Sequence, residues 1–347
     1  MNKKNKSRDG EKNMDIMLFA LNASKEWGNH LVSHIKNIRL ARHEERDFED
    51  GEHKARSLES VRGQRVFLLQ SLFSDHKQSV NDKLCRLLFF ISALKDASVR
   101  EVIVLIPYLA YARKDRKTKS RDPVTMKYVA RLLETAGADN VVTMDVHNLA
   151  AFQNAFRIPT EHLEARLLFA PYFANLIQDE EVTVVSPDVG GAKRAEQFRE
   201  TLSELLHREV GKAFLDKKRS AGEVSGGGVI IGEVKNRTTI IIDDMISSGT
   251  TISLATAALH REGAKRIMAC ATHGVFLDKA NQTLADSRLE RIVVTNTVLP
   301  YRLAKPLLQE KVVMLDASRL FAQAVKIMHD NGSVVELLQK YQEDGVG

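Results

Sequence analysis

Eight short apolar runs, separated by segments with helical periodicity, constrain the fold of this chain more than any other feature. Most of the runs are continuously apolar rather than alternating, which is typical of strands buried on both faces of a parallel sheet. Strands are predicted at 14–20, 65–70, 102–106, 141–145, 182–186, 238–243, 267–272 and 291–295. Helices are predicted at 24–36, 80–95, 123–136, 190–206, 250–262 and 317–329. This alternation predicts an α/β fold with mainly parallel sheets flanked by helices.

The length of 347 residues predicts two domains, because a single domain usually takes about 100–200 residues. The helices that end at Gly137 and Gly263 lead into strands through similar phrases, a weak sign of two related halves. The seam between them is expected near 158–175. Residues 1–13 are basic and have no apolar residue after Met1, which predicts a disordered tail.

Composition excludes several classes of protein. The longest apolar run, 87–94, is far shorter than the ~20 residues of a membrane span, and no secretory signal is evident. Cys85 and Cys270 are the only cysteines and form no CxxC motif, so a disulfide scaffold or structural zinc site is not expected. These features predict a cytoplasmic protein with no membrane partner. The net charge of +6 favours anionic partners, which include nucleotides and sugar phosphates as well as nucleic acid.

The most informative segment is an apolar strand that runs into two carboxylates and then into a Ser/Gly/Thr loop before a helix. Backbone N–H groups at a helix N-terminus attract phosphate, and α/β folds bind ligands at the carboxyl ends of their strands. The two acids can accept hydrogen bonds from sugar hydroxyls or hold a metal. The alternative, a pair of acids that only caps the turn, would not need this loop. The predicted binding residues are Asp243, Asp244, Ser247, Ser248, Gly249, Thr250 and Thr251.

An aromatic residue beside two acids marks a second candidate site in the first half. An adenine ring can stack on Phe48 while the acids Asp50 and Glu52, on either side of Gly51, accept hydrogen bonds from its amine. A tight surface turn explains the same residues equally well.

A basic run at 113–121 directly follows the strand 102–106 and a short turn. Its first residues, Arg113, Lys114 and Asp115, therefore lie at the edge where a sheet binds ligands, which favours a triphosphate. Taken alone, the run could be a solvated face or a nucleic-acid patch. Nucleic-acid binding would also need aromatic platforms or groove-entering helices, and neither is evident.

Polar residues that follow two further predicted strands, and others beside a Gly-rich stretch, are also candidate site residues. His147 follows the strand 141–145, where a structural histidine is the usual interpretation. Asp188 follows the strand 182–186 and precedes two glycines whose N–H groups can approach a pyrophosphate; the acid can also serve as a helix N-cap. Lys217 and Arg219 adjoin a Gly-rich stretch, which suggests a mobile loop that closes over anions, although solvated loop charge is the usual interpretation of such residues.

Five of these motifs, taken in order, resemble those of the ribose-phosphate pyrophosphokinase family, which makes phosphoribosyl pyrophosphate (PRPP). They are the segments 48–52, 111–117, 185–191, 243–251 and 294–297, and the resemblance extends from about residue 14 to 340. Lys114 stands where the family usually has Gln, and the loop 247–251 is one residue shorter than usual, so the chain resembles a divergent member.

The resemblance implies two similar domains of type I phosphoribosyltransferase-like fold. They would be an ATP-side domain at 14–160 and a ribose 5-phosphate-side domain at 161–305, with 306–347 packing back on the first. The implied reaction transfers the β,γ-diphosphoryl group of ATP to the C1 hydroxyl of ribose 5-phosphate, giving PRPP and AMP. Two alternatives are a non-catalytic regulatory subunit and a phosphoribosyltransferase that consumes PRPP.

The resemblance also implies the role of each site residue. Lys217 and Arg219 would be catalytic, with Arg219 also on ribose 5-phosphate, and His147 and Asp188 would bind Mg²⁺. A homo-oligomer is implied, because the loop 48–52 would meet ATP bound by a neighbouring subunit. ATP would contact Phe48, Asp50, Gly51, Glu52, Arg113, Lys114 and Asp115, and ribose 5-phosphate would contact Asp243, Asp244 and the loop 247–251.

Overall fold

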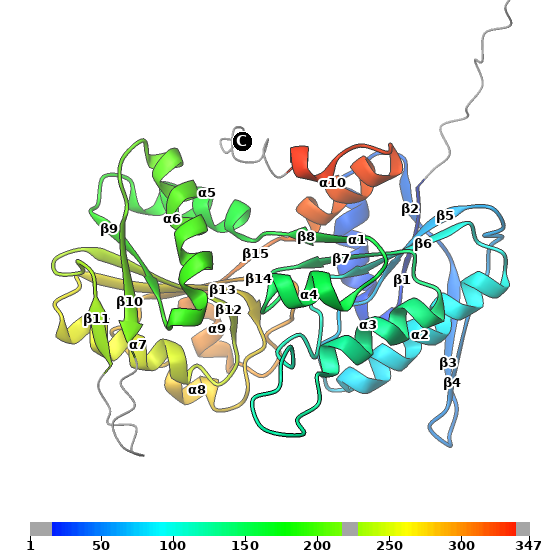
Figure 1. Ribbon diagram of the computed structural model, residues 1–347, viewed down its shortest axis with the longest axis horizontal. Helices are drawn as coiled ribbons and strands as arrows, with labels where there is room; N and C mark the ends of the chain where they lie inside the picture. Colours follow the sequence, from blue (N-terminus) through cyan, green and yellow to red (C-terminus); the bar gives the residue numbers. More distant parts are fainter. Residues whose placement is uncertain (1–15, 217–227, 338–347) are drawn as a thin grey trace, which may run out of the picture.

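The structure is a computed structural model that describes residues 16–216 and 228–337. The predicted tail at 1–13 lies outside the described residues, as do Lys217 and Arg219. Within the described ranges the chain forms two mainly parallel sheets, each flanked by helices on both faces, and the predicted fold class is confirmed (Figure 1).

The first sheet has six parallel strands in the order β2-β1-β5-β6-β7-β8 within the described residues. Its four central strands are the predicted ones and are buried on both faces. The edge strands β2 and β8 were not predicted, because they are short and partly polar. The strands are β1 (Ile16–Ala20), β2 (Ile38–Leu40), β5 (Arg65–Leu69), β6 (Glu101–Ile106), β7 (Asn140–Met144) and β8 (Thr160–Leu163).

The second sheet has seven strands in the order β11-β10-β9-β12-β13-β14-β15, and of these described strands only β11 runs antiparallel to its neighbour. Its four central strands were predicted. Both edges were missed, since β10, β11 and β15 are short or interrupted by polar residues. The strands are β9 (Val182–Ser186), β10 (Gly211–Asp216), β11 (Val229–Ile231), β12 (Thr238–Ile246), β13 (Arg266–Gly274), β14 (Arg291–Thr295) and β15 (Val312–Leu315).

The helices divide between opposite faces of each sheet (Figure 1). On the first sheet, α1 (Lys25–Ser33) and α10 (Ser318–His329) cover one face, while α2 (Val80–Asp96), α3 (Thr125–Ala136) and α4 (Leu149–Ala155) lie on the other. On the second sheet, α5 (Arg166–Ile177) and α6 (Ala192–Leu206) lie opposite α7 (Thr250–Arg261), α8 (Ala280–Thr283) and α9 (Lys305–Lys311). All six predicted helices are present, and Gly137 ends α3 at a φ of 106°, as the predicted C-cap requires.

The last described helix, α10, packs on the first domain rather than on the sheet that precedes it. The rings of Trp27 in α1 and Phe321 in α10 meet edge to face, with centroids 5.2 Å apart. Arg65 of β5 donates from Nη1 to the carbonyl oxygen of Met328, at the end of α10 (2.7 Å). One continuous apolar core, which includes Phe67, Phe173 and Phe321, therefore joins the two sheets.

The predicted domain boundaries can be compared with the strands that each sheet contains. The boundary predicted at 160 coincides with the start of β8, which still pairs with the first sheet. The predicted segment 306–347 contains β15, which pairs with the second sheet, as well as α10. The division into four parts stays a prediction.

A polar hairpin of β3 (His43–Asp47) and β4 (His53–Ser57) projects from the first sheet beside α2 (Figure 1). It was not predicted, because its strands are charged rather than apolar. Cross-strand pairing of Glu44 with Arg56 (2.6 Å) and contacts with α2 hold it. The predicted turn at 48–52 forms its tip, where Gly51 has a φ of 90°.

Candidate functional site

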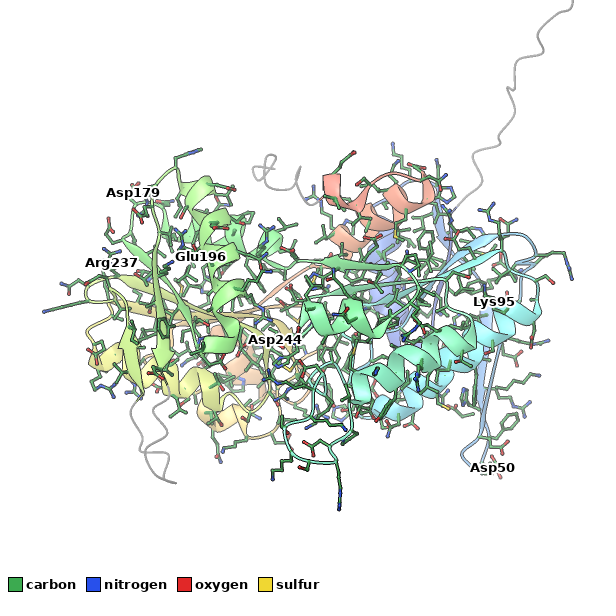
Figure 2. All side chains as sticks on the ribbon, in the orientation of Figure 1. Asp50, Lys95, Asp179, Glu196, Arg237 and Asp244 are labelled. Carbon is green, nitrogen blue, oxygen red and sulfur yellow. The ribbon has the colours of Figure 1, made fainter. Side chains whose placement is uncertain are left out.

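A cleft of about 580 Å³ opens between the two sheets, where loops at the carboxyl ends of their strands meet. Segments that follow β6, β7 and β9, together with the carboxyl half of β12, supply most of its wall, as expected for ligand sites in parallel sheets. The chemically active side chains that line it are Asp115, Arg116, Asp145, His147, His162, Glu164, Arg166, Asp188, Lys193, Arg194, Asp243 and Asp244. Figure 2 shows Asp244 near the centre of the molecule, between the two lobes.

A direct polar contact joins the two sheets inside this cleft. His147, just after β7, lies with Nδ1 2.9 Å from Oδ2 of Asp244 on β12. Arg194, on the first turn of α6, places Nη1 3.7 Å from Oδ1 of both Asp243 and Asp244. Three motifs that are far apart in the sequence therefore meet around one pair of acids.

The surroundings of Asp243 and Asp244 shift the pKa values of the two carboxyl groups in opposite directions. Burial, together with the adjacent charge of Asp244, raises the pKa of Asp243 to about 7. Burial also opposes ionisation of Asp244, but the hydrogen bond with His147 and the charge of Arg194 outweigh it and lower the pKa of Asp244. The same hydrogen bond raises the pKa of His147 above that of a free imidazole. One acid is thus held as a carboxylate while its neighbour can carry a proton near neutral pH.

Asp188 lies in the part of the cleft wall that the second sheet supplies. It ends the loop after β9, and its Oδ1 accepts a hydrogen bond from the N–H of Gly191 (3.0 Å), as the N-cap interpretation predicted. Gly191 lies so close to Ser186 that a Cβ atom would be 2.8 Å from the serine Oγ, so a larger residue would disturb the turn. The backbone here is open to a ligand, while Asp188 faces the cleft.

The predicted phosphate loop follows β12 and forms the start of α7. Gly249 has a φ of 75°, which favours glycine, and the hydroxyl oxygens of Ser248 and Thr250 lie 3.0 Å apart. Ser247, Ser248, Gly249, Thr250 and Thr251 are not among the described residues that line the 580 Å³ cleft. They continue from Asp243 and Asp244, so the acids connect the cleft to the loop.

The predicted ATP residues are not brought together in one chain. Asp115 lies in the cleft, where its Oδ2 accepts a hydrogen bond from Asn148 Nδ2 (2.8 Å). Arg113 and Lys114 are exposed and do not line the described cleft. The hairpin tip with Phe48, Asp50, Gly51 and Glu52 lies at the outer end of the first domain, well away from Asp244 (Figure 2).

Several cleft residues were missed by sequence reasoning. Lys193 and Arg194 come one residue after the two glycines that follow Asp188, so positive charge at the first turn of a helix was the available signal. Asp145 ends a predicted strand, as Asp243 does, and its Oδ2 accepts from Thr272 of the second sheet (2.5 Å). Arg166 carried no signal, because it belongs to α5 within the expected seam.

The described residues contain no cluster of three His, Cys, Asp or Glu side chains arranged to enclose a metal ion. Mg²⁺ commonly binds through one or two carboxylates together with substrate phosphates and water. The carboxylate of Asp188 in the wall of a polar cleft fits that mode of binding, and His147 presents its second ring nitrogen, since Nδ1 is engaged by Asp244. The donor set therefore fits a cation that arrives with a polyphosphate.

The described residues include no helix that is long and apolar enough to cross a membrane.

Two protein-family models match the chain. The N-terminal domain of ribose phosphate pyrophosphokinase matches residues 16–137, and the phosphoribosyl synthetase-associated domain matches residues 223–339.

Similar proteins span almost the whole chain. A ribose-phosphate pyrophosphokinase of Fusobacterium nucleatum is 40% identical over 325 residues, covering 93% of this chain and 98% of the relative. One from Bacillus caldolyticus is 38% identical, covering 92% and 96%. A crystal structure of phosphoribosylpyrophosphate synthetase from Mycobacterium smegmatis matches with a TM-score of 0.82 and 35% identity, covering 92% of this chain and 100% of that one. These matches confirm the resemblance that the motifs indicated, and the chain belongs to the ribose-phosphate pyrophosphokinase family.

Proposed function

We propose that the chain transfers the β,γ-diphosphoryl group of ATP to ribose 5-phosphate, giving PRPP and AMP. The observation that carries this proposal is the convergence of His147, Asp188, Arg194 and the acid pair in one interdomain cleft that leads to the loop 247–251. The C1 hydroxyl oxygen attacks the β-phosphorus, the bond from that phosphorus to the α,β-bridging oxygen breaks, AMP leaves, and the hydroxyl proton is released.

The sugar side of the reaction is assigned to the second domain. The loop 247–251 holds the 5-phosphate through backbone N–H groups at the start of α7. Asp243 and Asp244 accept hydrogen bonds from the ribose hydroxyls. Arg194 lies beside both acids and places a fixed positive charge next to the transferring phosphates, and catalysis of this kind depends mainly on positioning and charge.

The proposed cofactor is Mg²⁺, which when bound neutralises phosphate charge. His147 would hold the ion that accompanies ATP, and Asp188 would hold a second one. Asp244 keeps the imidazole of His147 in place through Nδ1, so the other ring nitrogen is available to the ion. Lys217 and Arg219 are proposed as catalytic from their position in the sequence alone.

The nucleotide side is proposed to need a second copy of the chain. Asp115 faces the cleft and Arg113 and Lys114 are its sequence neighbours, but the hairpin tip at 48–52 is remote from Asp244 in the same chain (Figure 2). The tip would therefore complete the ATP site of a neighbouring subunit in a homo-oligomer. We place the protein in the reducing cytoplasm, in keeping with its two free cysteines, Cys85 and Cys270.

An assay with ATP, ribose 5-phosphate and Mg²⁺ that follows AMP and PRPP together tests the proposal. Equal amounts of the two products, lost when EDTA removes the metal, are expected. Binding of both substrates without either product would indicate the regulatory subunit instead. Consumption of PRPP in the presence of a free base, without ATP, would indicate a phosphoribosyltransferase.

A further inference from the structure

We propose that Thr283 is a positioning residue that holds the backbone of the loop 247–251 in its phosphate-binding form. Thr283 ends the short helix α8 and is separate from every motif discussed above. Its hydroxyl donates to the carbonyl oxygen of Ser248 at 2.5 Å. The inference rests on the proposed function, because it requires this loop to hold the 5-phosphate.

Three consecutive carbonyl groups of the loop region are bound from behind by one segment. Phe276 N–H donates to the oxygen of Ile246 (2.9 Å), Leu277 N–H to that of Ser247 (2.9 Å), and the Thr283 hydroxyl to that of Ser248. The segment 276–284 thus forms a backing strip behind the loop. Thr283 supplies the only one of these three bonds that comes from a side chain.

This pattern fixes the direction of the loop's donors. In a trans peptide the C=O of one residue and the N–H of the next point in opposite directions, and the described residues contain no cis peptide bond. When the carbonyls of Ile246, Ser247 and Ser248 face the backing strip, the N–H groups of Ser247, Ser248 and Gly249 face away from it. Within the described residues these three N–H groups donate to no other protein atom. They are therefore available to an anion.

Close packing keeps the loop from moving back towards the strip. A Cβ atom on Gly249 would lie 2.5 Å from the Thr283 hydroxyl oxygen and 2.9 Å from Leu284. The strip is itself anchored by Phe276, which is fully buried at a φ of 36°. Thr283 consequently acts as both a hydrogen-bond donor and a steric stop.

The Thr283 hydroxyl has other acceptors within reach, and substitutions that remove or keep this donor test its role. The carbonyl oxygens of Lys279 and Ala280 in its own helix lie at 3.2 and 3.4 Å, farther than that of Ser248. A Thr283→Val variant keeps the shape of the side chain and removes the donor, leaving the Ser248 carbonyl free to rotate. Thr283→Ser keeps the donor. Thr256→Val is a matched control, because Thr256 is a buried threonine of α7 whose hydroxyl donates to Ile252 within the same helix (2.8 Å).

The experiment measures binding of ribose 5-phosphate and of inorganic phosphate to the full chain by calorimetry, with KM and kcat for both substrates. Thr283→Val is expected to weaken both ligands about fivefold, the value of one neutral hydrogen bond, and to raise KM for ribose 5-phosphate while KM for ATP stays unchanged. Thr283→Ser and Thr256→Val are expected to stay within about twofold of wild type.

Equal loss for ATP and ribose 5-phosphate, or the same loss in Thr256→Val, would overturn the positioning role in favour of general destabilisation. Unchanged binding in Thr283→Val, when wild type binds both ligands, would overturn this inference alone. Absence of binding in wild type would overturn the proposed function and the inference with it.

Discussion

The two sheets use the loops at their strand ends differently. In the second sheet, the loop after β9 and the end of β12 line the cleft, where Asp188 and the acid pair lie within one chain. In the first sheet, the loop after β7 brings His147 to the cleft, whereas the hairpin carries Asp50 away from it (Figure 2) and the loop after β5 contacts the second domain elsewhere. The residues proposed for the sugar side therefore lie together within one chain, and those proposed for the nucleotide side do not.

The loop after β5 shows what else a strand-end loop can do. Its Ser74 accepts a hydrogen bond at the carbonyl oxygen from the Tyr301 hydroxyl and one at Oγ from Arg302 (2.8 Å), both in the second domain. The fully buried Lys83 pairs with Asp75 of this loop at 2.6 Å and lies 3.9 Å from the centroid of Phe73. Here the contacts fix one domain against the other.

Asp244→Asn tests whether the second sheet carries the chemistry, and it should have the largest effect. The substitution removes the charge that faces His147 and Arg194, and loss of one preorganised polar group in an active site typically costs about 100-fold in kcat or more. AMP formation measures the effect. Asp286→Asn is the control, because that acid pairs with Arg288 outside the cleft. A loss smaller than about tenfold would remove Asp244 from the proposed machinery.

Mixing two inactive variants tests whether the first sheet serves a neighbour. Phe48→Ala/Asp50→Asn alters the hairpin tip, while Asp244→Asn alters the cleft. If the tip completes another subunit's site, random co-assembly restores about a quarter of the sites, each with an intact tip and an intact cleft. The measurement is AMP formation after the variants are dissociated and reassembled together. No recovery in confirmed mixed oligomers would place the tip and the cleft in the same chain's function.

Asp75→Asn should change stability rather than chemistry, in contrast with Asp244. It leaves the buried Lys83 ammonium without its counter-charge, which typically costs about 3 kcal/mol, so the thermal midpoint should fall. Adding Lys83→Met to Asp75→Asn should recover most of this loss, because no buried ammonium is then left without a counter-charge. Scanning calorimetry gives the midpoints. A thermal midpoint for Asp75→Asn equal to that of wild type would show that the ion pair between Lys83 and Asp75 does not stabilise the fold.

The smallest expected effect is on the pH dependence of stability without ligand. Asp243 has a folded pKa of about 7 against an ordinary value of 3.8, so the folded chain binds more protons between these values and its stability falls as pH rises through them. Asp243→Asn should flatten the fall of the thermal midpoint over about pH 4.5–6, below the range where His147 titrates. Glu161→Gln in β8, where burial alone raises the pKa of the carboxyl, is the comparison in the first sheet. An unchanged slope in Asp243→Asn would show that Asp243 is ionised throughout this range.

The strands and the strand-end residues were predictable because both follow from local pattern. A short continuous apolar run bounded by turn residues favours a buried strand, and polar residues at its carboxyl end mark the ligand edge. The hairpin β3–β4 was not predictable in this way. Its charged strands pack against α2, where Arg86 pairs with Asp47 (2.5 Å), a contact between residues 39 positions apart.

The pairing of the site residues also lay beyond sequence reasoning. His147 and Asp244 were predicted as a metal ligand and a sugar ligand, but their contact joins residues 97 positions apart. The position of Thr283 behind the loop 247–251 depends on how the chain turns after β13. Such contacts are set by packing between elements, which no local pattern records.

The packing of α10 on α1 has a consequence for the order in which the protein is made. Trp27 leaves the ribosome about 300 residues before Phe321, the ring that covers it, and at about 5–20 residues per second this delay is about 15–60 s. During that time α1 is on this face of the first sheet without α10 beside it. The nascent first domain therefore cannot complete its core until α10 has been made, and a chain interrupted before α10 would present this apolar face to chaperones.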